Sequence, residues 1–306
     1  MLALYARNFI NKFYNPDVIY GDITLRERDR VPGHLDLYAS GFPCQPYSLA
    51  GKMNGFNDVR SEPAHECLCY ILEKLPRSFF LENVAALVEH FTDDFNALIT
   101  FLRDIKDPVN LAGNGGPYYE VHWMIVDSVT HSGLPQSRRR VYVVGLAKHS
   151  MKKPFEPPGP ITCKPLQDIL SDRCGCPQDV CMLSNTKRKN VHTLYAKYAN
   201  KNHSIHDYIA DIGASSVSAT DQVCPCLTAS RTGDMGYWSL RRRRQLDMHE
   251  LMALQGVSAA TFPSWDQVVS QRQMGNIIGN AMTVSYVRRL VAQMLDCMGY
   301  PVNKMA

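Results

Sequence analysis

The sequence lacks any apolar run long enough to cross a lipid bilayer, and it also lacks internal repeats and low-complexity tracts. Its 10 cysteines are scattered along 306 residues, which is too sparse for a disulfide scaffold. The net charge is only +4, so composition by itself does not require a polyanionic partner. We therefore expect no membrane insertion, reduced thiols and an intracellular location, in the nucleus if the source is eukaryotic and in the cytoplasm if it is bacterial.

The chain is long enough to bury a substantial core, because 45% of its 306 residues are apolar. Its first half alternates between strand-like and helix-like patterns. We expect strands at 17–20, 35–39, 78–81, 119–129 and 141–146, and helices at 1–15, 61–74 and 95–105. This alternation predicts an α/β fold built on a central sheet.

The second half of the chain has a different texture. A proline-rich connector covers 151–165, and an irregular stretch rich in Cys, Asn, Ser and Thr follows it. Helical periodicity returns after Leu246, where one apolar stripe predicts a long amphipathic helix. That stripe consists of Val284, Val287, Leu290, Val291, Met294, Leu295 and Met298. We predict a large lobe over 1–150, a smaller lobe over 151–245, and a return to the large lobe over 246–306.

The most informative segment is 41–48, which reads Gly-Phe-Pro-Cys-Gln-Pro-Tyr-Ser and directly follows the strand expected at 35–39. Open α/β sheets place their chemistry at the C-terminal ends of such strands. Cys44 stands between two prolines that restrict the backbone, and a rigidly held thiol suits a covalent nucleophile. A buried structural cysteine is the alternative.

Two further polar features fall at the ends of predicted strands. Glu82 follows the strand at 78–81, and three consecutive arginines occupy 138–140, just before the strand at 141–146. A thiol, a carboxylate and guanidinium groups at one rim of a sheet are expected to form a single site. Each feature also has a plainer interpretation, because Glu82 could cap the next helix and the arginines could form a solvated edge.

Together these segments resemble the cytosine C5 DNA methyltransferases, and they occur in that family's order over nearly the whole chain. The resemblance is carried by Gly41-Phe42-Pro43-Cys44-Gln45-Pro46-Tyr47-Ser48 with Gly51, Gly55, Asp58 and Arg60, by Glu82-Asn83-Val84, by Gln136-Ser137-Arg138-Arg139-Arg140, by Glu250 with Leu254-Gln255-Gly256, and by Gly279-Asn280-Ala281. It implies the Rossmann-like sheet of S-adenosylmethionine-dependent methyltransferases in 1–150 and 246–306. It also implies a small target-recognition domain in 151–245.

The implied activity is that of a DNA (cytosine-5-)-methyltransferase with S-adenosyl-L-methionine as cofactor. By resemblance, Cys44 adds to C6 of a cytosine flipped out of the duplex, which activates C5 for methylation. Glu82 contacts N3 and the exocyclic amine, and Asn83 helps to fix the loop around the nucleophile. Arg138 faces the cytosine O2, and Arg140 supports the site.

The implied partner is double-stranded DNA, and we expect a monomer. Base edges are read by the recognition domain, while phosphate contacts position it. The residues expected to contact DNA are Gln45, Ser48, Arg60, Gln136, Arg231, Arg241 and Arg243. For the basic residues of the recognition domain, the alternative is a strand face that simply meets solvent. Cys226 stands where a threonine is usual in this family.

The expected cofactor contacts are Asp22, Ile23, Pro43, Asn280 and Ala281. The family pattern begins with a strand and a glycine-rich turn, but nothing glycine-rich precedes Gly21. We therefore predict an N-terminally truncated chain whose sheet lacks its first strands. In such a sheet the strand at 17–20 has no neighbour, and the strand before Cys44 forms an exposed apolar edge.

Two alternative functions follow from these departures. The first is a non-catalytic remnant that binds DNA without binding the cofactor. The second is an RNA cytosine methyltransferase, although the Cys-Phe-Thr segment of that branch is absent from the sequence. We expect no metal site, because the spacing of the candidate ligands is unusual for zinc. Those candidates are Cys174, Cys176, Cys181, His203 and His206.

Overall fold

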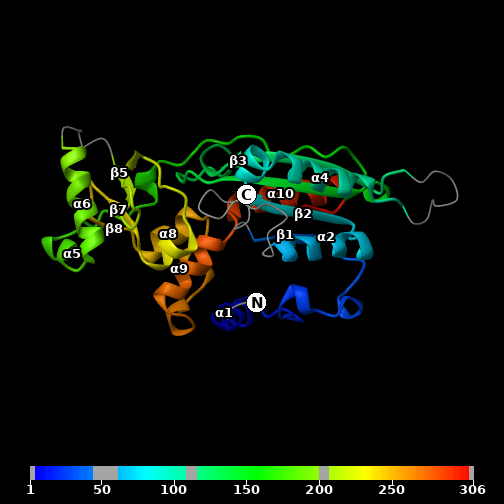
Figure 1. Ribbon diagram of the computed structural model, residues 1–306, viewed down its shortest axis with the longest axis horizontal. Helices are drawn as coiled ribbons and strands as arrows, with labels where there is room; N and C mark the ends of the chain where they lie inside the picture. The colour runs from blue at the N-terminus through cyan, green and yellow to red at the C-terminus, as the bar shows by residue number, and fades with distance from the viewer. Residues whose placement is uncertain (1–3, 44–60, 108–115, 200–206, 303–306) are drawn as a thin grey trace.

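The computed structural model describes residues 4–43, 61–107, 116–199 and 207–302 (Figure 1). Two four-stranded sheets lie toward opposite ends of the long axis, with the orders β1-β2-β4-β3 and β6-β5-β7-β8. The predicted α/β class is confirmed. Within the described part of the chain, every helix is too short or too polar to cross a membrane.

The first sheet brings the ends of three strands to one edge. Strand β1 (Tyr38–Gly41) runs parallel to β2 (Ser78–Val84), and Gly41 lies opposite Glu82. Strand β4 (Arg139–Ala147) runs antiparallel to β2, so that Val84 lies opposite Arg140. Strand β3 (Tyr119–Asp127) completes the sheet beside β4. The C-terminal ends of β1 and β2 therefore meet the beginning of β4.

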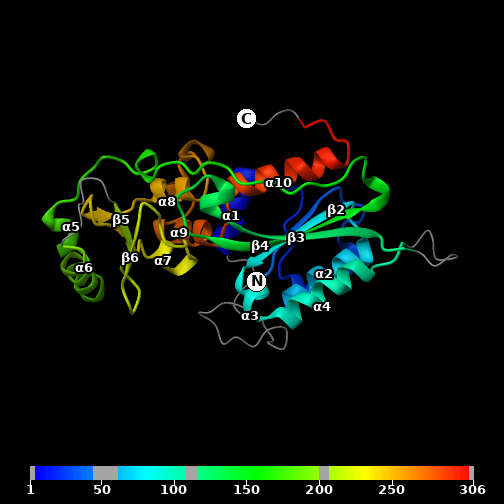
Figure 2. The same ribbon diagram turned by 90° about the horizontal axis from the view of Figure 1, so that it is seen from above.

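Helices cover both faces of this sheet (Figure 2). One face packs against α2 (Glu62–Lys74), α3 (Ala86–His90) and α4 (Thr92–Asp104), and the other packs against α10 (Val284–Cys297). Side chains alternate along β2, so Phe79 and Leu81 join the first core and Phe80 joins the second. Most of the apolar stripe predicted for the C-terminal helix faces the sheet, while Val284 packs on the core shared with the smaller lobe.

The N-terminal segment differs from the prediction. The helix expected at 1–15 is confirmed as α1 (Leu4–Tyr14), but the strand expected at 17–20 is absent. Val18 is 59% exposed, and within the described residues β1 pairs with β2 alone, so the segment 17–20 has no strand partner. The strand expected at 35–39 begins only at Tyr38. An apolar run forms a strand only where a neighbouring strand can satisfy its backbone hydrogen bonds.

The stretch that reads as irregular folds into a second sheet with short helices. Its elements are α5 (Pro177–Cys181), α6 (Asn185–Lys197), β5 (Tyr208–Asp211), β6 (Ala219–Asp221), α7 (Ala229–Gly233), β7 (Tyr237–Ser239) and β8 (Arg244–Gln245). Its strands are too short for a visible period in the sequence. Helices α8 (Met248–Leu254) and α9 (Gln271–Asn280) share a core with this sheet and with Phe9 of α1.

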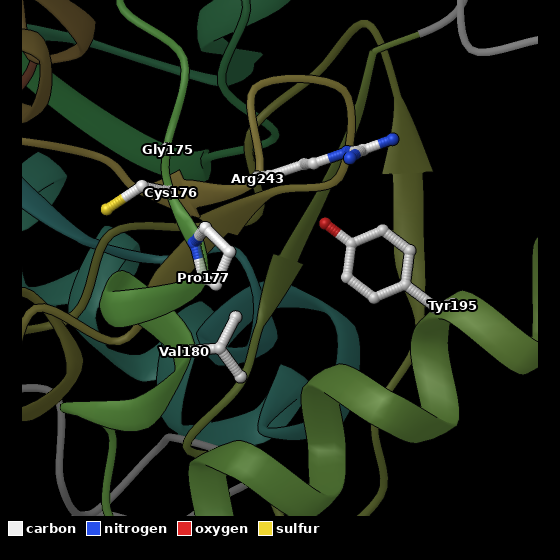
Figure 3. A pocket seen from close by; sticks show the side chains of 6 residues that line it. All are labelled: Gly175, Cys176, Pro177, Val180, Tyr195 and Arg243. Atoms are coloured by element: carbon white, nitrogen blue, oxygen red, sulfur yellow. The ribbon is translucent and has the colours of Figure 1, made fainter.

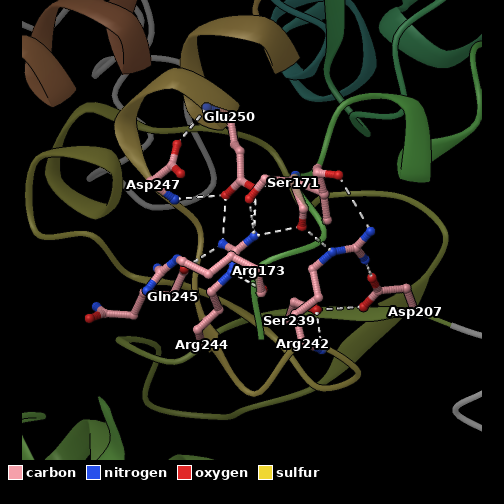
Figure 4. A network of polar contacts seen from close by, with 10 residues as sticks. Ser171, Arg173, Asp207, Ser239, Arg242, Arg244, Gln245, Asp247 and Glu250 are labelled. Atoms are coloured by element: carbon pink, nitrogen blue, oxygen red, sulfur yellow. Dashed lines mark hydrogen bonds and ion pairs between the residues drawn. The ribbon is translucent and has the colours of Figure 1, made fainter. Parts of the chain in front are cut away.

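The run Arg241 to Arg244 alternates between exposed and buried side chains. Arg242 pairs with Asp207, and Arg244 donates to both carboxylate oxygens of Glu250 at 2.6 and 2.8 Å (Figure 4). Arg241 and Arg243 remain exposed at the turn between β7 and β8. Two of the four arginines therefore anchor the turn, and the other two are presented to solvent.

We predict that Glu250→Gln lowers the free energy of unfolding by roughly 3 kcal/mol at pH 7, because it leaves a buried guanidinium without its charge partner. Burial alone raises the pKa of Glu250, but hydrogen bonds from Arg244, Asp247 and Ser171 lower it below its ordinary 4.5 overall. The folded-state pKa is thus below the unfolded one. The stabilisation is complete above pH 4.5 and is lost as the pH falls through the folded pKa.

Urea unfolding of both proteins between pH 7 and pH 3 measures this difference, which should shrink as the pH falls below 4.5 and through the folded-state pKa. Glu27→Gln is the matched control, because the Arg30–Glu27 pair is 78% and 66% exposed. That control should cost less than about 1 kcal/mol at any pH. An equal loss in the two variants would contradict the anchoring role of Glu250.

Candidate active site

A cavity of about 400 Å³ lies at the edge where β1 and β2 end and β4 begins. Segments from both lobes contribute to it. Its lining residues are Gly41, Phe42, Pro43, Glu82, Val84, Arg138, Arg140, Leu227, Thr228, Ala229, Gly279 and Asn280. The structure thus brings together the carboxylate, the arginine run and the residue before Cys44, as the sequence predicts.

Glu82 and Arg140 form the charged centre of this cavity. Their Oε1 and Nε atoms are 3.0 Å apart, and the two side chains are only 12% and 14% exposed. Gly41 lets this carboxylate approach β1, because a Cβ atom at Gly41 would lie 3.3 Å from Glu82 Oε2 and 2.9 Å from Met282 Cε. Glu82 does not cap the next helix, since the N-cap of α3 is Ala85. The helix-cap alternative is therefore wrong.

Asn83 holds the backbone that leads to the predicted nucleophile. It is 2% exposed, and its Nδ2 donates to the Phe42 carbonyl at 3.3 Å. Its Oδ1 accepts from the Val84 amide at 2.8 Å. The side chain therefore links β2 to the end of β1. The predicted site residues Cys44, Gln45, Ser48 and Arg60 lie outside the described residues.

Arg138 is part of the cavity wall, with only 3% of its surface exposed. Its Nη1 donates to the Leu227 carbonyl at 2.7 Å, and its Nη2 donates to the Ala281 carbonyl at 2.8 Å. Burial, with a smaller effect of Arg140, lowers its pKa. Arg138 thus ties together a segment of each wall. Arg140 instead pairs with Glu82 inside the cavity.

Gln136 is fully buried, so its predicted contact with DNA is not supported. Its Nε2 donates to the Leu254 carbonyl and to Gln255 Oε1, both at 2.8 Å, and its Oε1 accepts from the Leu227 amide at 3.1 Å. A side chain whose donors and acceptor are satisfied inside the protein has nothing left to offer a base or a phosphate. The sequence motif marks the position without revealing its burial.

The residues expected to bind the cofactor fall into two groups. Pro43 and Asn280 line the cavity, and Ala281 follows directly behind them. Asp22 and Ile23 are not among the lining residues. Asp22 caps a short helical turn, and hydrogen bonds from the Thr24 amide and hydroxyl lower its pKa. The structure therefore places Pro43 and Asn280 at the cavity with Glu82, and it does not place Asp22 or Ile23 there.

The candidate DNA contacts of the small lobe have different surroundings. Arg231, on α7, pairs with Asp211 at 3.0 Å, only two residues beyond the cavity wall at Ala229. Arg243 lies at the opposite end of the small sheet, where it faces Tyr195 across a hollow of about 310 Å³ (Figure 3). The ion pair with Asp211 restrains the Arg231 side chain near the cavity wall.

Sequence reasoning did not pick out the basic surface of helix α6. Its segment reads NTKRKNVHTLYAK, which contains no acidic residue. Lys189, His192 and Lys197 are exposed on this helix, which packs beside the turn carrying Arg243. The absence of acidic residues was the signal that could have revealed it.

The cysteine-rich part of this lobe does not assemble a metal site in the part of the chain that the structure describes, where no group of three His, Cys, Asp or Glu residues could hold an ion. Cys174, Cys176 and Cys181 are exposed free thiols there. The two histidines of the candidate set, His203 and His206, lie outside the described residues.

Nearly the whole chain matches one protein family. The model of the C-5 cytosine-specific DNA methylase family matches residues 2–296. This chain belongs to that family. It is 30% identical over 287 residues to the type II methyltransferase M.HaeII of Haemophilus aegyptius, covering 93% of this chain and 81% of the relative. With M.MspI of a Moraxella species it shares 29% identity over 280 residues, covering 90% and 59%.

Solved structures of methyltransferases share the fold. The Entamoeba histolytica methyltransferase EhMeth aligns with a TM-score of 0.63 at 16% identity, covering 97% of this chain and 88% of that one. The Dnmt2 methyltransferase of S. pombe aligns with a TM-score of 0.61 at 15% identity, covering 98% and 90%. At these identities the likeness concerns the fold alone.

The predicted truncation is not borne out. It rested on the absence of a glycine-rich turn before Gly21, yet the family match begins at residue 2. The match to M.HaeII likewise extends over 93% of this chain.

We predict that Arg138→Lys lowers the free energy of unfolding by roughly 2 kcal/mol, because the single nitrogen of lysine cannot reproduce the two separate donor nitrogens with which the planar guanidinium bridges the carbonyls. Urea unfolding at pH 7 measures the change. The neighbouring Arg139→Lys is the matched control, since its ion pair with Glu89 is 53% and 34% exposed. The control should lose less than about 1 kcal/mol. Similar losses in both variants would argue against a bridging role for Arg138.

Proposed function

We propose that this chain transfers a methyl group from S-adenosylmethionine to C5 of a cytosine flipped out of double-stranded DNA. The observation that carries the proposal is the Glu82–Arg140 pair in a cavity whose rim includes Pro43, the residue before Cys44. Membership of the C-5 cytosine-specific DNA methylase family supports the reaction class. A stacked base cannot reach such a recessed pair, so the target must leave the helix.

In this proposal Cys44 supplies the nucleophile. Its thiolate adds to C6 of the cytosine, a new S–C6 bond forms, and the electrons of the C5–C6 double bond make C5 nucleophilic. S-adenosylmethionine, when bound, supplies an electrophilic methyl group that C5 can take, and cleavage of the methyl–sulfur bond leaves S-adenosylhomocysteine. A base then removes the C5 proton, the S–C6 bond breaks, and the thiolate is released as the double bond returns.

The charged pair matches the Watson–Crick edge of cytosine. That edge presents an amine, a ring nitrogen and a carbonyl oxygen in a row. We assign N3 and the exocyclic amine to Glu82 and the O2 atom to Arg140, whose side chain is beside it. The resemblance alone points to Arg138 for O2, but both terminal nitrogens of Arg138 already donate to backbone carbonyls. In our proposal Arg138 instead supports the cavity walls through its hydrogen bonds to the Leu227 and Ala281 carbonyls.

The methyl donor is expected on the side of the cavity formed by Pro43 and Asn280. These residues place a bound donor next to the base held by Glu82. Asp22 and Ile23 remain proposed contacts for the distant adenine end, by resemblance. We propose the division into a catalytic part over 1–150 and 246–306 and a recognition part over 151–245 on the same basis.

The decisive experiment is transfer of a labelled methyl group to duplex DNA of mixed sequence. Cys44→Ser is expected to abolish the activity, and Glu82→Gln to lower kcat by about 100-fold because it removes an acid–base group. Cys181→Ser is the matched control, as this thiol is exposed on the other lobe and should leave kcat unchanged. Full activity of Cys44→Ser would disprove the covalent mechanism.

The same assay separates the alternative functions. Binding of DNA with no methyl transfer and no binding of the methyl donor by calorimetry would indicate a non-catalytic remnant. Methylation of transfer RNA in preference to DNA would indicate the RNA-modifying branch. The Dnmt2-like fold does not by itself favour that branch, because the identity to those structures is too low.

We further propose that Arg241 and Arg243 contact DNA phosphates beyond the target base. Both side chains are exposed, while the intervening Arg242 is buried in its pair with Asp207. The exposed lysines of α6 extend the same positive surface. Because such contacts release counterions without reading bases, they should strengthen binding to every sequence equally.

Replacing both Arg241 and Arg243 by Gln should therefore reduce the slope of log Kd against log salt by about 0.9 for each lost contact. Fluorescence anisotropy with a labelled duplex between 50 and 200 mM salt measures the slope. Lys153→Gln is the control with no expected change, because it only breaks an ion pair with Asp296 of α10. A change in the preferred base sequence instead of the slope would assign these arginines to base readout.

A further inference from the structure

Behind the cavity lies a buried chain of two side-chain amides that the catalytic proposal does not use. Gln136 precedes β4 of the first sheet, and Gln255 ends helix α8, which shares a core with the second sheet. Both are fully buried. Gln136 Nε2 donates to Gln255 Oε1 at 2.8 Å. Buried polar side chains of this kind are retained only when their partners are well placed.

The two amides connect the two walls of the cavity. On one wall, Gln136 Oε1 accepts from the Leu227 amide at 3.1 Å, and Leu227 itself lines the cavity. On the other wall, Gln255 Nε2 donates to the Ala281 carbonyl at 2.6 Å and to the Ile278 carbonyl at 3.2 Å. Ala281 directly follows Asn280, which also lines the cavity.

The direction of the hydrogen bonds is fixed along the whole chain. Because Gln136 Oε1 accepts from an amide, its nitrogen must point to the Leu254 carbonyl and to Gln255 Oε1. The oxygen of Gln255 is then occupied, so its nitrogen must face Ala281. Reversing either amide would oppose like groups at every link. The position of Leu227 is therefore coupled to the position of Ala281.

The backbones of the two walls are also in direct contact. A Cβ atom at Gly279 would lie 2.4 Å from the carbonyl carbon of Thr228, and one at Gly275 would lie 2.4 Å from the Thr232 carbonyl oxygen. Helices α7 and α9 thus pack through glycines at a spacing of four residues. In such close packing a shift of one wall cannot be absorbed by side chains and must move the other.

We propose that Gln255, acting through Gln136, is a positioning residue that couples the recognition wall at 227–229 to the catalytic wall at 279–281. The proposal rests on the proposed function, in which the flipped cytosine and the methyl donor lie between these walls. Gln255 touches neither reactant. It sets the distance between groups that do, and small errors in that distance are costly for catalysis.

Gln255→Glu tests the coupling with minimal change in shape. The carboxylate can still accept from Gln136, but it cannot donate to the Ala281 and Ile278 carbonyls. We expect kcat for DNA methylation at saturating DNA to fall by about 10- to 100-fold, as for small misplacements of reacting groups. The Kd for duplex DNA should stay within about twofold, because the phosphate contacts are elsewhere.

Thr283→Val is the matched control, since it removes the buried hydrogen bond to Ser128 Oγ at 3.0 Å without touching either amide. It should lower the melting temperature to a similar extent and leave kcat within about twofold. Gln255→Met, which removes the donors without adding charge, is measured in parallel. If Gln255→Glu fails to fold, the same expectations apply to Gln255→Met.

Amide hydrogen exchange provides a readout that does not depend on activity. In the Gln255 variants the peptide covering 226–229 should exchange faster, although Gln255 does not contact it. Faster exchange confined to 278–281 would overturn the coupling. An unchanged kcat with faster exchange in both walls would overturn the positioning role of Gln255. If the wild-type chain methylates no cytosine, the proposed function fails, while the exchange measurement still decides the coupling.

Discussion

The antiparallel pairing of β2 with β4 is the constraint on which the candidate site depends. It places the end of one strand against the beginning of the other, so that Glu82 and Arg140 face the same cavity. Arg138 lies two residues before Arg140 and reaches back into the protein, where it binds carbonyls of both cavity walls. The beginning of β4 therefore supplies Arg140, which pairs with Glu82, and it is preceded by Arg138, which connects the cavity walls.

Arg138 also connects the two walls of the cavity. The carbonyls of Leu227 and Ala281 belong to segments far apart in sequence, yet both accept from one guanidinium. Leaving either carbonyl buried without a donor would cost free energy comparable to a lost hydrogen bond. Separation of the lobes is thus opposed by polar groups that water could satisfy only after the junction opens. The smaller lobe is therefore held by a residue that also lines the cavity.

Much of the first lobe was predictable from sequence, because its strands and helices are long enough to show their periods. The Glu82 and 138–140 features could be placed at strand ends for the same reason. The burial of Gln136 and the division of labour between Arg138 and Arg140 could not be predicted, since a motif specifies residue types and not which way they face. The short strands of the small sheet and the pairing of Arg242 depend on contacts distant in sequence, which a local pattern does not contain.

The turn that carries Arg241 and Arg243 contains one residue with a positive φ angle. Arg243 adopts a left-handed conformation with φ of 55°, which residues with a side chain seldom adopt. The buried ion pairs of Arg242 and Arg244 fix the turn on the protein. The two exposed side chains take no part in these ion pairs. Side chains there can be exchanged while the scaffold beneath them stays intact. Replacement of either exposed side chain would therefore change the charge of this surface while it removes neither of the buried ion pairs beneath it.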